Sequence, residues 1–483
     1  MNREKNYVTE LLSKQGINVS KNEQLLDAFV SDDEIQDSII SIKKLQKRIM
    51  EKWKIKTRVL DFKNTSIIIP NGTEGFDYNH NFDSQFFIEK EVISYAFKGL
   101  EELGLTFDPK ANSISGKLIA NGSFKIQILF KVEGEEDSSE LHEKSINFVI
   151  NPDPKSLWKN IPSDKEAIYW KEDNRSSAMD IGDKKIVVSS KRGRSHQNVG
   201  SFRDDDFAYK HFEKTGWTVV TVADGAGSAS LSRKGSELAC QELINYLEEE
   251  VSDETWNQFD IEIKKFITSK DEQALINAKE LGIQSLYQSV LHSHKHIKKI
   301  AEDTYDQYPE IFTNPRAKNN FDYFHSTLIC AVFKKIEEKY VIITFSVGDC
   351  PIGIVNKDKT KAKLLNWLDV GEFGGGTRFV TQAEIFHSKE RPPATRFNLH
   401  IEEDFSYLFL MTDGIYDAKF EVEANLEKTE KWLTFLNDLD GNNEDKIKVD
   451  FSEEHEVVEE QLNNWMDFWS KGNHDDRTLA IIY

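Results

Sequence analysis

The sequence predicts an α+β fold: a four-layer α-β-β-α sandwich, preceded by a small helical segment and an all-β sandwich. Strands rich in β-branched residues are expected at 186–190 and 218–223, and an amphipathic helix follows at 234–249. Further helical turns at 274–300 separate these from a second group of strands. Helices that are segregated between groups of strands favour two stacked sheets with helices outside. The second group of strands is expected at 327–333, 340–347 and 353–356.

Changes in hydrophobic period divide the chain into four predicted domains or segments. Apolar residues recur at helical spacing up to about residue 55, and period-2 alternation then begins, as in Phe124, Ile126 and Ile128. A later stretch combines prolines with tryptophans, which is typical of a linker packed onto a neighbour. The predicted segments are 1–55, helical; 56–152, a β-sandwich; 153–177, a proline- and aromatic-rich linker; and 178–483, the largest domain.

Composition excludes several classes of function. The formal net charge of −21 argues against nucleic acid as a partner, because neutralising phosphates requires a lysine- or arginine-rich surface. The sequence contains no long apolar span, so no membrane partner is expected. Its three cysteines, Cys240, Cys330 and Cys350, lack the spacing of a disulfide framework or a zinc site. We therefore expect a soluble, cytoplasmic protein.

Acidic residues lie at the ends of three predicted strands. Asp224 follows the strand at 218–223, Asp413 follows an apolar run, and the pair Asp475 and Asp476 precedes the last strand. Hard divalent cations such as Mg²⁺ or Mn²⁺ prefer several carboxylate oxygens on rigid elements. Any one of these aspartates alone is more typical of a simple turn. Three in the same setting indicate a metal site.

Together with two further motifs, these acidic segments resemble the metal-dependent serine/threonine protein phosphatases of the 2C type. The motifs are G-R-S-H-Q-N-V-G-S-F-R-D-D-D-F at 193–207 and S-V-G-D-C-P-I at 346–352. That family carries an acidic pair, Asp-Gly, Gly-Asp, a second Asp-Gly and an Asp-Asn-x-Thr-like run, and all five occur here in that order. The resemblance covers 178–483 and implies the four-layer sandwich.

The resemblance implies a set of metal ligands. Asp224 corresponds to the carboxylate that bridges two ions, and the Gly225 carbonyl binds directly or through a water. Asp413 and Asp475 correspond to the remaining ligands of one ion, with Asp476 in the asparagine place. Two positions are less sharply defined. The acidic pair corresponds to Asp204 and Asp205; the run through Asp206 leaves the register open by one residue, and Asp205 is preferred as the ligand. Asp349 matches a position that helps hold a third, weaker ion.

The catalytic side chains other than the metal ligands are harder to assign. The family's phosphate-binding arginine lies shortly before the acidic pair, and Arg192, Arg194 and Arg203 compete for that role, with Arg194 preferred. His196 is a candidate phosphate ligand or acid, although a single loop histidine is more often structural. Many eukaryotic members have histidine directly after the first Asp-Gly, whereas this chain has Ala226, as in the bacterial branch.

Two other segments resemble segments of known protein families. Residues 364–381 contain Gly374, Gly375 and Gly376 and occupy the place of the family's flap beside the active site, although glycine runs are also ordinary surface loops. In the N-terminal part, I-P-N-G-T-E-G-F-D-Y at 69–78 resembles bacterial putative-immunoglobulin modules, so the sandwich at 56–152 is expected to be immunoglobulin-like and to serve as a spacer or docking module.

The predicted function is hydrolysis of phosphoserine or phosphothreonine in proteins, by water activated by two Mn²⁺ or Mg²⁺ ions, in a bacterial signalling or stress system with a partner kinase. Two bound cations lower the pKa of water from about 15.7 to near 7 and neutralise phosphoryl charge. Two alternatives stay open: a catalytically idle phosphatase-like domain that binds a partner, and an enzyme acting on a small phosphorylated molecule. The converging aspartates favour catalysis, because like charges repel unless an ion binds them.

Overall fold

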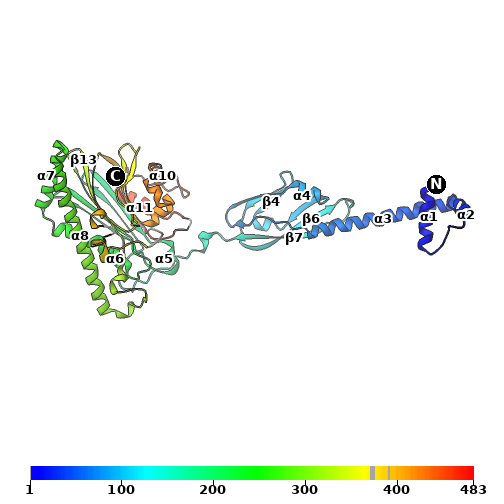
Figure 1. The fold of residues 1–483 in the computed structure, drawn as a ribbon, viewed down its shortest axis with the longest axis horizontal. Helices are drawn as coiled ribbons and strands as arrows, with labels where there is room; N and C mark the ends of the chain where they lie inside the picture. The colour runs from blue at the N-terminus through cyan, green and yellow to red at the C-terminus, as the bar shows by residue number, and fades with distance from the viewer. Residues whose placement is uncertain (1, 370–375, 390–391, 471) are drawn as a thin grey trace. The chain divides into compact units, whose positions relative to one another are not determined.

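The computed structural model describes residues 2–369, 376–389, 392–470 and 472–483. The chain forms two compact units, Met1–Leu157 and Trp158–Tyr483 (Figure 1). The division falls inside the stretch predicted as a linker. Each unit has its own hydrophobic core, and the predicted catalytic and metal-binding residues all belong to the second.

The first unit begins with helices α1 (Asn2–Lys14), α2 (Glu23–Val30) and α3 (Asp33–Asn64). Asp32 caps α3, because its carboxylate accepts a hydrogen bond of 3.0 Å from the amide of Glu34. No glycine or proline interrupts α3, so this helix continues past residue 55, where the helical segment was expected to end.

Two small sheets complete the first unit. Along strand β6 (Gly122–Val132) every second residue from Ile126 to Val132 is buried, as the alternation predicted. Phe62 of α3 is fully buried against this sheet, with its ring centroid 4.5 Å from that of Phe130. The immunoglobulin-like character of this region stays a prediction. The four-stranded sheet has the order β1 (Gly72–Thr73), β7 (His142–Asn151), β6 (Gly122–Val132), β3 (Val92–Lys98); the three-stranded sheet has the order β2 (Asp77–Asn81), β5 (Ser113–Lys117), β4 (Leu105–Asp108); and helix α4 spans Ser84–Glu89.

The second unit contains a five-stranded and a six-stranded sheet, both entirely antiparallel. The first has the order β10 (Asp206–Phe212), β11 (Trp217–Ala223), β12 (Leu328–Ile336), β13 (Lys339–Val347), β16 (Phe397–Glu402). The second has the order β15 (Ala362–Leu364), β14 (Ile352–Asn356), β17 (Phe405–Met411), β18 (Arg477–Ile482), β9 (Lys184–Lys191), β8 (Asn174–Ile181).

Helices cover the outer face of each sheet, so the unit has four layers (Figure 1). One apolar core lies between the five-stranded sheet and its helices, a second lies between the two sheets, and a third lies between the six-stranded sheet and the remaining helices. The helices on the first face are α6 (Ser232–Glu249), α7 (Asp253–Ser269) and α8 (Glu272–Gln307); those on the second are α9 (Asp413–Phe420), α10 (Thr429–Leu439) and α11 (His455–Trp465); and the short α5 spans Arg194–Val199.

Strand β11 shows why this sequence builds a double layer. Val219 and Ala223 face the core under the helices, whereas Val220 and Val222 face the core between the sheets. Successive side chains of a strand point to opposite faces, so a strand covered on both sides is apolar throughout. All seven residues of β11 are buried, which fits its place inside the sandwich.

Some elements differ from the sequence-based expectation. Helix α7 and strand β16 were not predicted, because charged residues break up the apolar pattern of α7 and polar ones that of β16. Helix α8 is longer than the expected 274–300, because Asp271 caps it and its buried positions continue to Thr304. Among the helices that the structure describes, none combines the length and apolar character needed to cross a membrane.

Candidate active site

The ends of strands from both sheets meet at one edge of the second unit. In the five-stranded sheet Asp206 lies opposite Ala223, so the neighbouring Asp205 and Asp224 occupy the same end of the β10–β11 pair. In the other sheet Met411 pairs with Leu479, which brings Thr412 beside Thr478. This register, set by the apolar strands, gathers aspartates that are as much as 272 positions apart in the chain, as Asp204 and Asp476 are.

Asp205 joins the two sheets. Its side chain is 1% exposed, and its Oδ2 accepts hydrogen bonds from the hydroxyls of Thr412 (2.8 Å) and Thr478 (2.9 Å). Burial, followed by repulsion from Asp476, raises the pKa of Asp205 well above its usual value, although the Thr412 hydroxyl opposes this rise. The Thr412 hydroxyl therefore offsets part of the rise in the pKa of Asp205.

Asp476 is held by hydrogen bonds on both of its oxygens. Oδ1 accepts from the amide of Gly193 (2.6 Å) and lies 3.0 Å from His196 Nδ1, while Oδ2 accepts from the amide of Asp204 (2.5 Å). Burial alone would raise the pKa of Asp476, but the charge of His196 and these backbone donors outweigh it, so its pKa is lowered. The carboxylate of Asp476 is therefore largely satisfied by the protein itself.

His196 is the cationic counterpart of this carboxylate. Its Nε2 lies 3.8 Å from Asp204 Oδ2, opposite the ring nitrogen that faces Asp476. Burial lowers the pKa of the imidazole, but Asp476, Asp204 and Asp475 together raise it to about 10. The ring therefore carries a proton at neutral pH.

Two carboxylate oxygens at this edge have no such support. Asp349 Oδ1 and Asp413 Oδ1 are buried and have no hydrogen-bond partner among the residues that the structure describes. Burial and the charges of Asp349 and Asp475 raise the pKa of Asp413 to about 8, and burial raises that of Asp349. Buried, unpaired carboxylate oxygens cost free energy, so this arrangement calls for a cation.

Asp224 lies at the centre of these groups. Its pKa is raised well above the usual value by burial and then by Asp413, Asp205, Asp475 and Asp349. Ligand atoms of Asp224, Asp349 and Cys350 lie within 4.8 Å of one another, and so do those of His196, Asp475 and Asp476. Asp475 itself is exposed to solvent. The structure thus brings together Asp204, Asp205, Asp224, Asp349, Asp413, Asp475 and Asp476.

Glycines allow the backbone to pass close to this cluster. A Cβ on Gly225 would lie 2.5 Å from the Asp204 carbonyl oxygen, and one on Gly193 would lie 2.2 Å from the Asp475 carbonyl carbon. Gly225 also forms a β-bridge with Ser326, which fixes the turn after Asp224. The Asp-Gly pattern therefore reflects packing at the site as well as turn formation.

The run of three aspartates divides between two environments. Asp206 binds Lys171 (2.9 Å) and Arg175 (2.9 Å) and lies 3.8 Å from Arg203, outside the acidic cluster. These cations overcome the effect of burial and lower its pKa to about 2. Asp204 and Asp205 are thus the two members of the run whose side chains join the cluster, and the sequence contained no signal for the partner Lys171, 35 residues upstream of Asp206.

None of the three candidate arginines has a described side-chain contact with a carboxylate of the cluster. Arg194 donates from Nη2 to the backbone carbonyl of Asp467 (2.7 Å), and its guanidinium lies 5.6 Å from the Trp469 ring centroid. Arg192 binds the Ser201 carbonyl and Asp173, and Arg203 binds Ser190 and the Asp205 carbonyl. The phosphate-binding role of Arg194 therefore stays a prediction.

Sequence reasoning did not identify the hydroxyl groups behind the aspartates. Thr412 and Thr478 were visible only as neighbours of acidic motifs, and their contact with Asp205 depends on strand register. Thr377 donates to Asp349 Oδ2 (2.8 Å) from the predicted flap. Gly374 and Gly375 of that flap lie outside the described residues, whereas Gly376 has a φ of +70°.

A four-layer sandwich with carboxylates gathered at one edge has the architecture that the phosphatase resemblance implied. A family model described as protein phosphatase 2C matches residues 192–467, more than half of the 483-residue chain. The chain therefore belongs to the protein phosphatase 2C family. The predicted family, fold class and enzyme class, a protein serine/threonine phosphatase, are confirmed. The match ends before Asp475 and Asp476. No curated protein matches the chain.

Several solved structures are similar to this chain at low identity. They include the catalytic domain of serine threonine protein phosphatase PstP in complex with 2 manganese ions (13% identity, 64% of this chain, 97% of that chain, TM-score 0.34). Others are RsbX in complex with magnesium (12%, 64%, 98%, 0.31) and the serine/threonine phosphatase Stp1 from Staphylococcus aureus (15%, 66%, 98%, 0.30). With TM-scores this low, these alignments add nothing to the family match.

Proposed function

We propose that this protein hydrolyses phosphoserine and phosphothreonine in proteins, using two Mn²⁺ or Mg²⁺ ions held by the aspartate cluster. The observation that carries the proposal is a pair of buried carboxylate oxygens beside Asp224, Asp349 Oδ1 and Asp413 Oδ1, for which the described residues offer no hydrogen-bond donor. Carboxylates that repel one another in a buried site require a cation, and oxygen donors suit hard divalent ions.

The residues divide between holding ions and supporting the ligands. Asp224, the Gly225 carbonyl, Asp413 and Asp475 would bind the ions, with Asp204 and Asp205 beside them and Asp349 at a third position. Asp476 is engaged by Gly193, Asp204 and His196, which fits a supporting role better than a direct one. Bound ions of this kind supply a water molecule that is deprotonated near neutral pH and neutralise phosphoryl charge.

His196 is our candidate for the group that handles a proton or binds phosphate. Asp476 orients its Nδ1, which leaves the proton on Nε2 directed toward the acidic cluster. In this family many members place histidine after the first Asp-Gly, where this chain has Ala226. A charged His196 would supply a donor in its absence.

The proposed substrate is a phosphorylated protein, which implies an opposing kinase and a place in bacterial signalling or stress responses. A cytoplasmic location is part of the proposal. It draws on the three cysteines, Cys240, Cys330 and Cys350, which are unpaired and buried, as is usual where thiols stay reduced.

The proposal is tested by hydrolysis of p-nitrophenyl phosphate and of a phosphothreonine peptide with Mn²⁺. Asp224→Asn and Asp413→Asn should each lower the rate about 1,000-fold or more, because groups that act as a unit fail together. A chelator should have the same effect. Asp253→Asn, the same change at an exposed residue of α7, should leave the rate unchanged.

Two outcomes would contradict this assignment. Full activity in Asp224→Asn would remove the aspartate cluster from the mechanism. If the metal-loaded wild-type protein hydrolysed neither substrate, the alternative of a catalytically idle binding domain would take its place.

A further inference from the structure

A separate group of metal-ligating side chains lies on the helical layer of the second unit. His292 and His296 are four residues apart on α8, so they point to the same side, one turn apart. Glu242 reaches them from α6: its Oε2 lies 3.3 Å from His292 Nε2 and 3.3 Å from His296 Nδ1. All three ligand atoms lie within 4.8 Å of one another.

Small residues bring the two helices close enough for this contact. Ala239 of α6 and Ser289 and Ser293 of α8 are fully buried, and the Ser293 hydroxyl donates to the Ala239 carbonyl (3.4 Å). His292 precedes Ser293 by one position, so it turns about 100° away from the buried line toward the rim. The side chains of His292 and His296 are 40% and 35% exposed, which leaves them accessible to an ion from solution.

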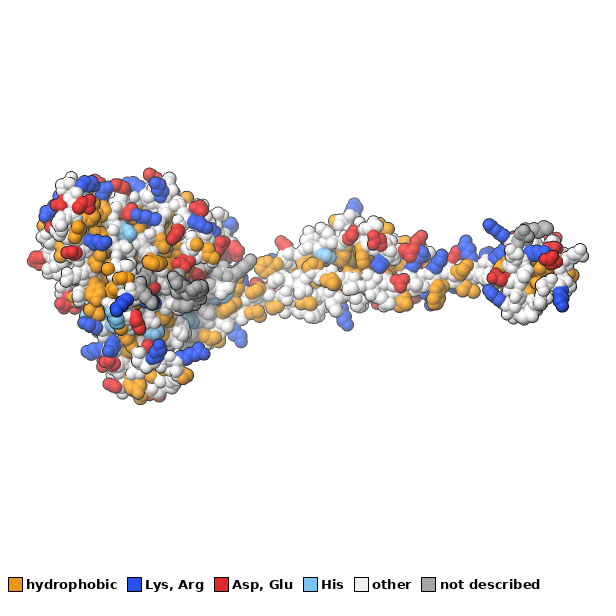
Figure 2. Space-filling view, in the orientation of Figure 1, with side chains coloured by type: hydrophobic (Ala, Val, Ile, Leu, Met, Phe, Trp, Pro, Cys, Tyr) orange, Lys and Arg blue, Asp and Glu red, His pale blue; other side chains and the backbone are white. Residues whose placement is uncertain are grey.

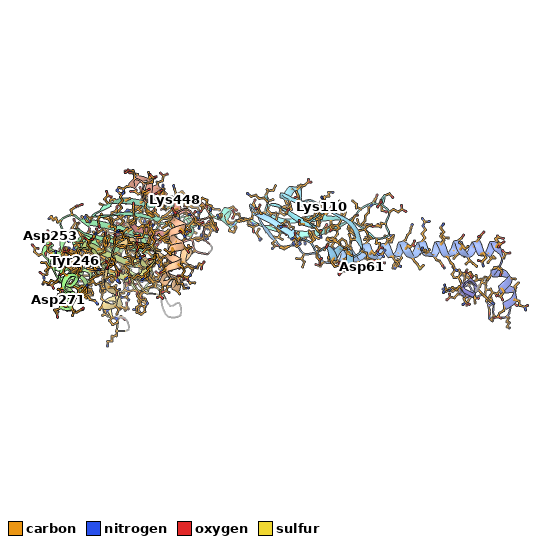
Figure 3. The ribbon with its side chains drawn as sticks, turned by 90° about the horizontal axis from the view of Figure 1, so that it is seen from above. Asp61, Lys110, Tyr246, Asp253, Asp271 and Lys448 are labelled. Carbon is orange, nitrogen blue, oxygen red and sulfur yellow. The ribbon has the colours of Figure 1, made fainter. Side chains whose placement is uncertain are left out.

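Neighbouring groups contact two of the three side chains, Glu242 and His292. The second oxygen of Glu242, Oε1, accepts a hydrogen bond from Asn245 Nδ2 (3.2 Å), which turns Oε2 toward the histidines. The ring of Tyr246, one turn further along α6 and labelled in Figure 3, lies 5.3 Å from the His292 ring. Supporting contacts of this kind hold ligands in place around a metal.

We propose that His292, His296 and Glu242 form a Zn²⁺ site. In tetrahedral zinc sites with ligands at about 2.0–2.1 Å, neighbouring donor atoms are about 3.3–3.4 Å apart. Both nitrogen–oxygen distances here are 3.3 Å. Two imidazoles and one carboxylate are a zinc ligand set that leaves a fourth position for water.

This site differs in chemistry from the aspartate cluster. Imidazole nitrogen favours Zn²⁺ over Mg²⁺ or Mn²⁺, whereas the cluster offers mainly carboxylate oxygen. The two sites share no residue. The ion would join α6 to α8 and stabilise the folded state by binding to it alone. Helix α6 also contacts the aspartate cluster, because its Ser236 hydroxyl donates to the Asp204 carbonyl.

The test is a Zn²⁺ titration of the full-length, metal-free protein, measured by calorimetry in the presence of a constant excess of Mg²⁺. The wild-type protein should bind one more Zn²⁺ than His292→Gln/His296→Gln. Removing supporting groups of zinc ligands costs 10–100-fold in affinity, so losing two ligands should weaken binding more than about 100-fold. Glu242→Gln should weaken it as well. Glu248→Gln, the same change six residues further along α6, should match the wild type.

Co²⁺ provides a second readout that is independent of activity. The wild type and Glu248→Gln should show the intense visible absorption of four-coordinate Co²⁺, and His292→Gln/His296→Gln should lack it. Far-UV circular dichroism checks folding, and the single variants His292→Gln and His296→Gln take over if the double variant does not fold. Equal Zn²⁺ stoichiometry and affinity in the wild type and the folded histidine variants would overturn the proposal.

Discussion

At the scale of single residues, buried hydroxyl groups support the carboxylates of the site. The Thr478 hydroxyl lies 2.9 Å from Asp205 Oδ2 and 2.7 Å from Ser190 Oγ, in a buried setting. It favours the ionised form of Asp205, because a hydrogen bond to a carboxylate lowers its pKa. This threonine therefore supports a proposed metal ligand without binding the ion itself.

Thr478→Val should raise the Mn²⁺ concentration needed for half-maximal hydrolysis about 10–100-fold, because removing a group that supports a ligand has effects of that size. Thr344→Val is the matched control: that hydroxyl is also buried, but it donates to the Leu365 carbonyl at 3.4 Å and not to an aspartate of the cluster in the described part of the chain. An unchanged Mn²⁺ requirement in Thr478→Val would show that the contact has no role in ion binding.

The pairing of His196 with Asp476 predicts a pH-dependent stability in the metal-free protein. The pKa of His196 rises from 6.5 to about 10 on folding. Its contribution to the free energy of unfolding is therefore complete below pH 6.5 and declines as the pH rises toward 10. Urea denaturation from pH 6 to pH 10 should show this decline in the wild type. In His196→Gln the decline should be smaller; an equal slope in both proteins would contradict the pairing.

Protons should also be released when Mn²⁺ binds. The pKa of Asp413 is raised to about 8 by burial and neighbouring carboxylates, so much of it is protonated at pH 7. The affinity for Mn²⁺ should therefore fall as the pH falls below 8. Calorimetry in two buffers of different ionisation enthalpy measures the release, and identical heats in both buffers would contradict this expectation.

At the scale of elements, close packing joins β14 to α10. A Cβ on Gly353 would lie 2.0 Å from the ring of Trp432, which is fully buried. Gly353→Ala should therefore lower the free energy of unfolding of the second unit by about 1–3 kcal/mol, as overpacking does. Urea denaturation measures this, with Gly227→Ala as control because a Cβ there meets nothing within 4 Å. Equal stability of the two variants would contradict the packing.

The sequence predicted elements better than contacts between them. The strands predicted at 218–223 and 340–347 lie within β11 and β13, because runs of β-branched residues favour strands. The resemblance assigned the acidic pair to Asp204 and Asp205, but nothing in the sequence excluded Asp206, because that depends on Lys171 and Arg175, which reach Asp206 from distant segments. Likewise, the Arg194 contact with Asp467 joins positions 273 residues apart, which no local pattern brings together.

At the scale of the whole molecule, the chain has two compact units with separate cores. Figure 2 shows acidic and basic side chains interspersed over the visible face of the second unit. All the residues that we assign to hydrolysis belong to that unit. Residues 158–483 alone should therefore hydrolyse p-nitrophenyl phosphate at a rate similar to that of the full chain, and loss of activity in a folded fragment would show that the first unit contributes to the site.

The central claim is that Asp224, Asp413 and Asp475 meet around a pair of divalent ions. Anomalous scattering from crystals grown with Mn²⁺ tests this most directly, because it locates the ions independently of activity. We predict two Mn²⁺ peaks in contact with these aspartates, one of them shared through Asp224. Peaks elsewhere on the molecule, with none between Asp224 and Asp413, would contradict the account.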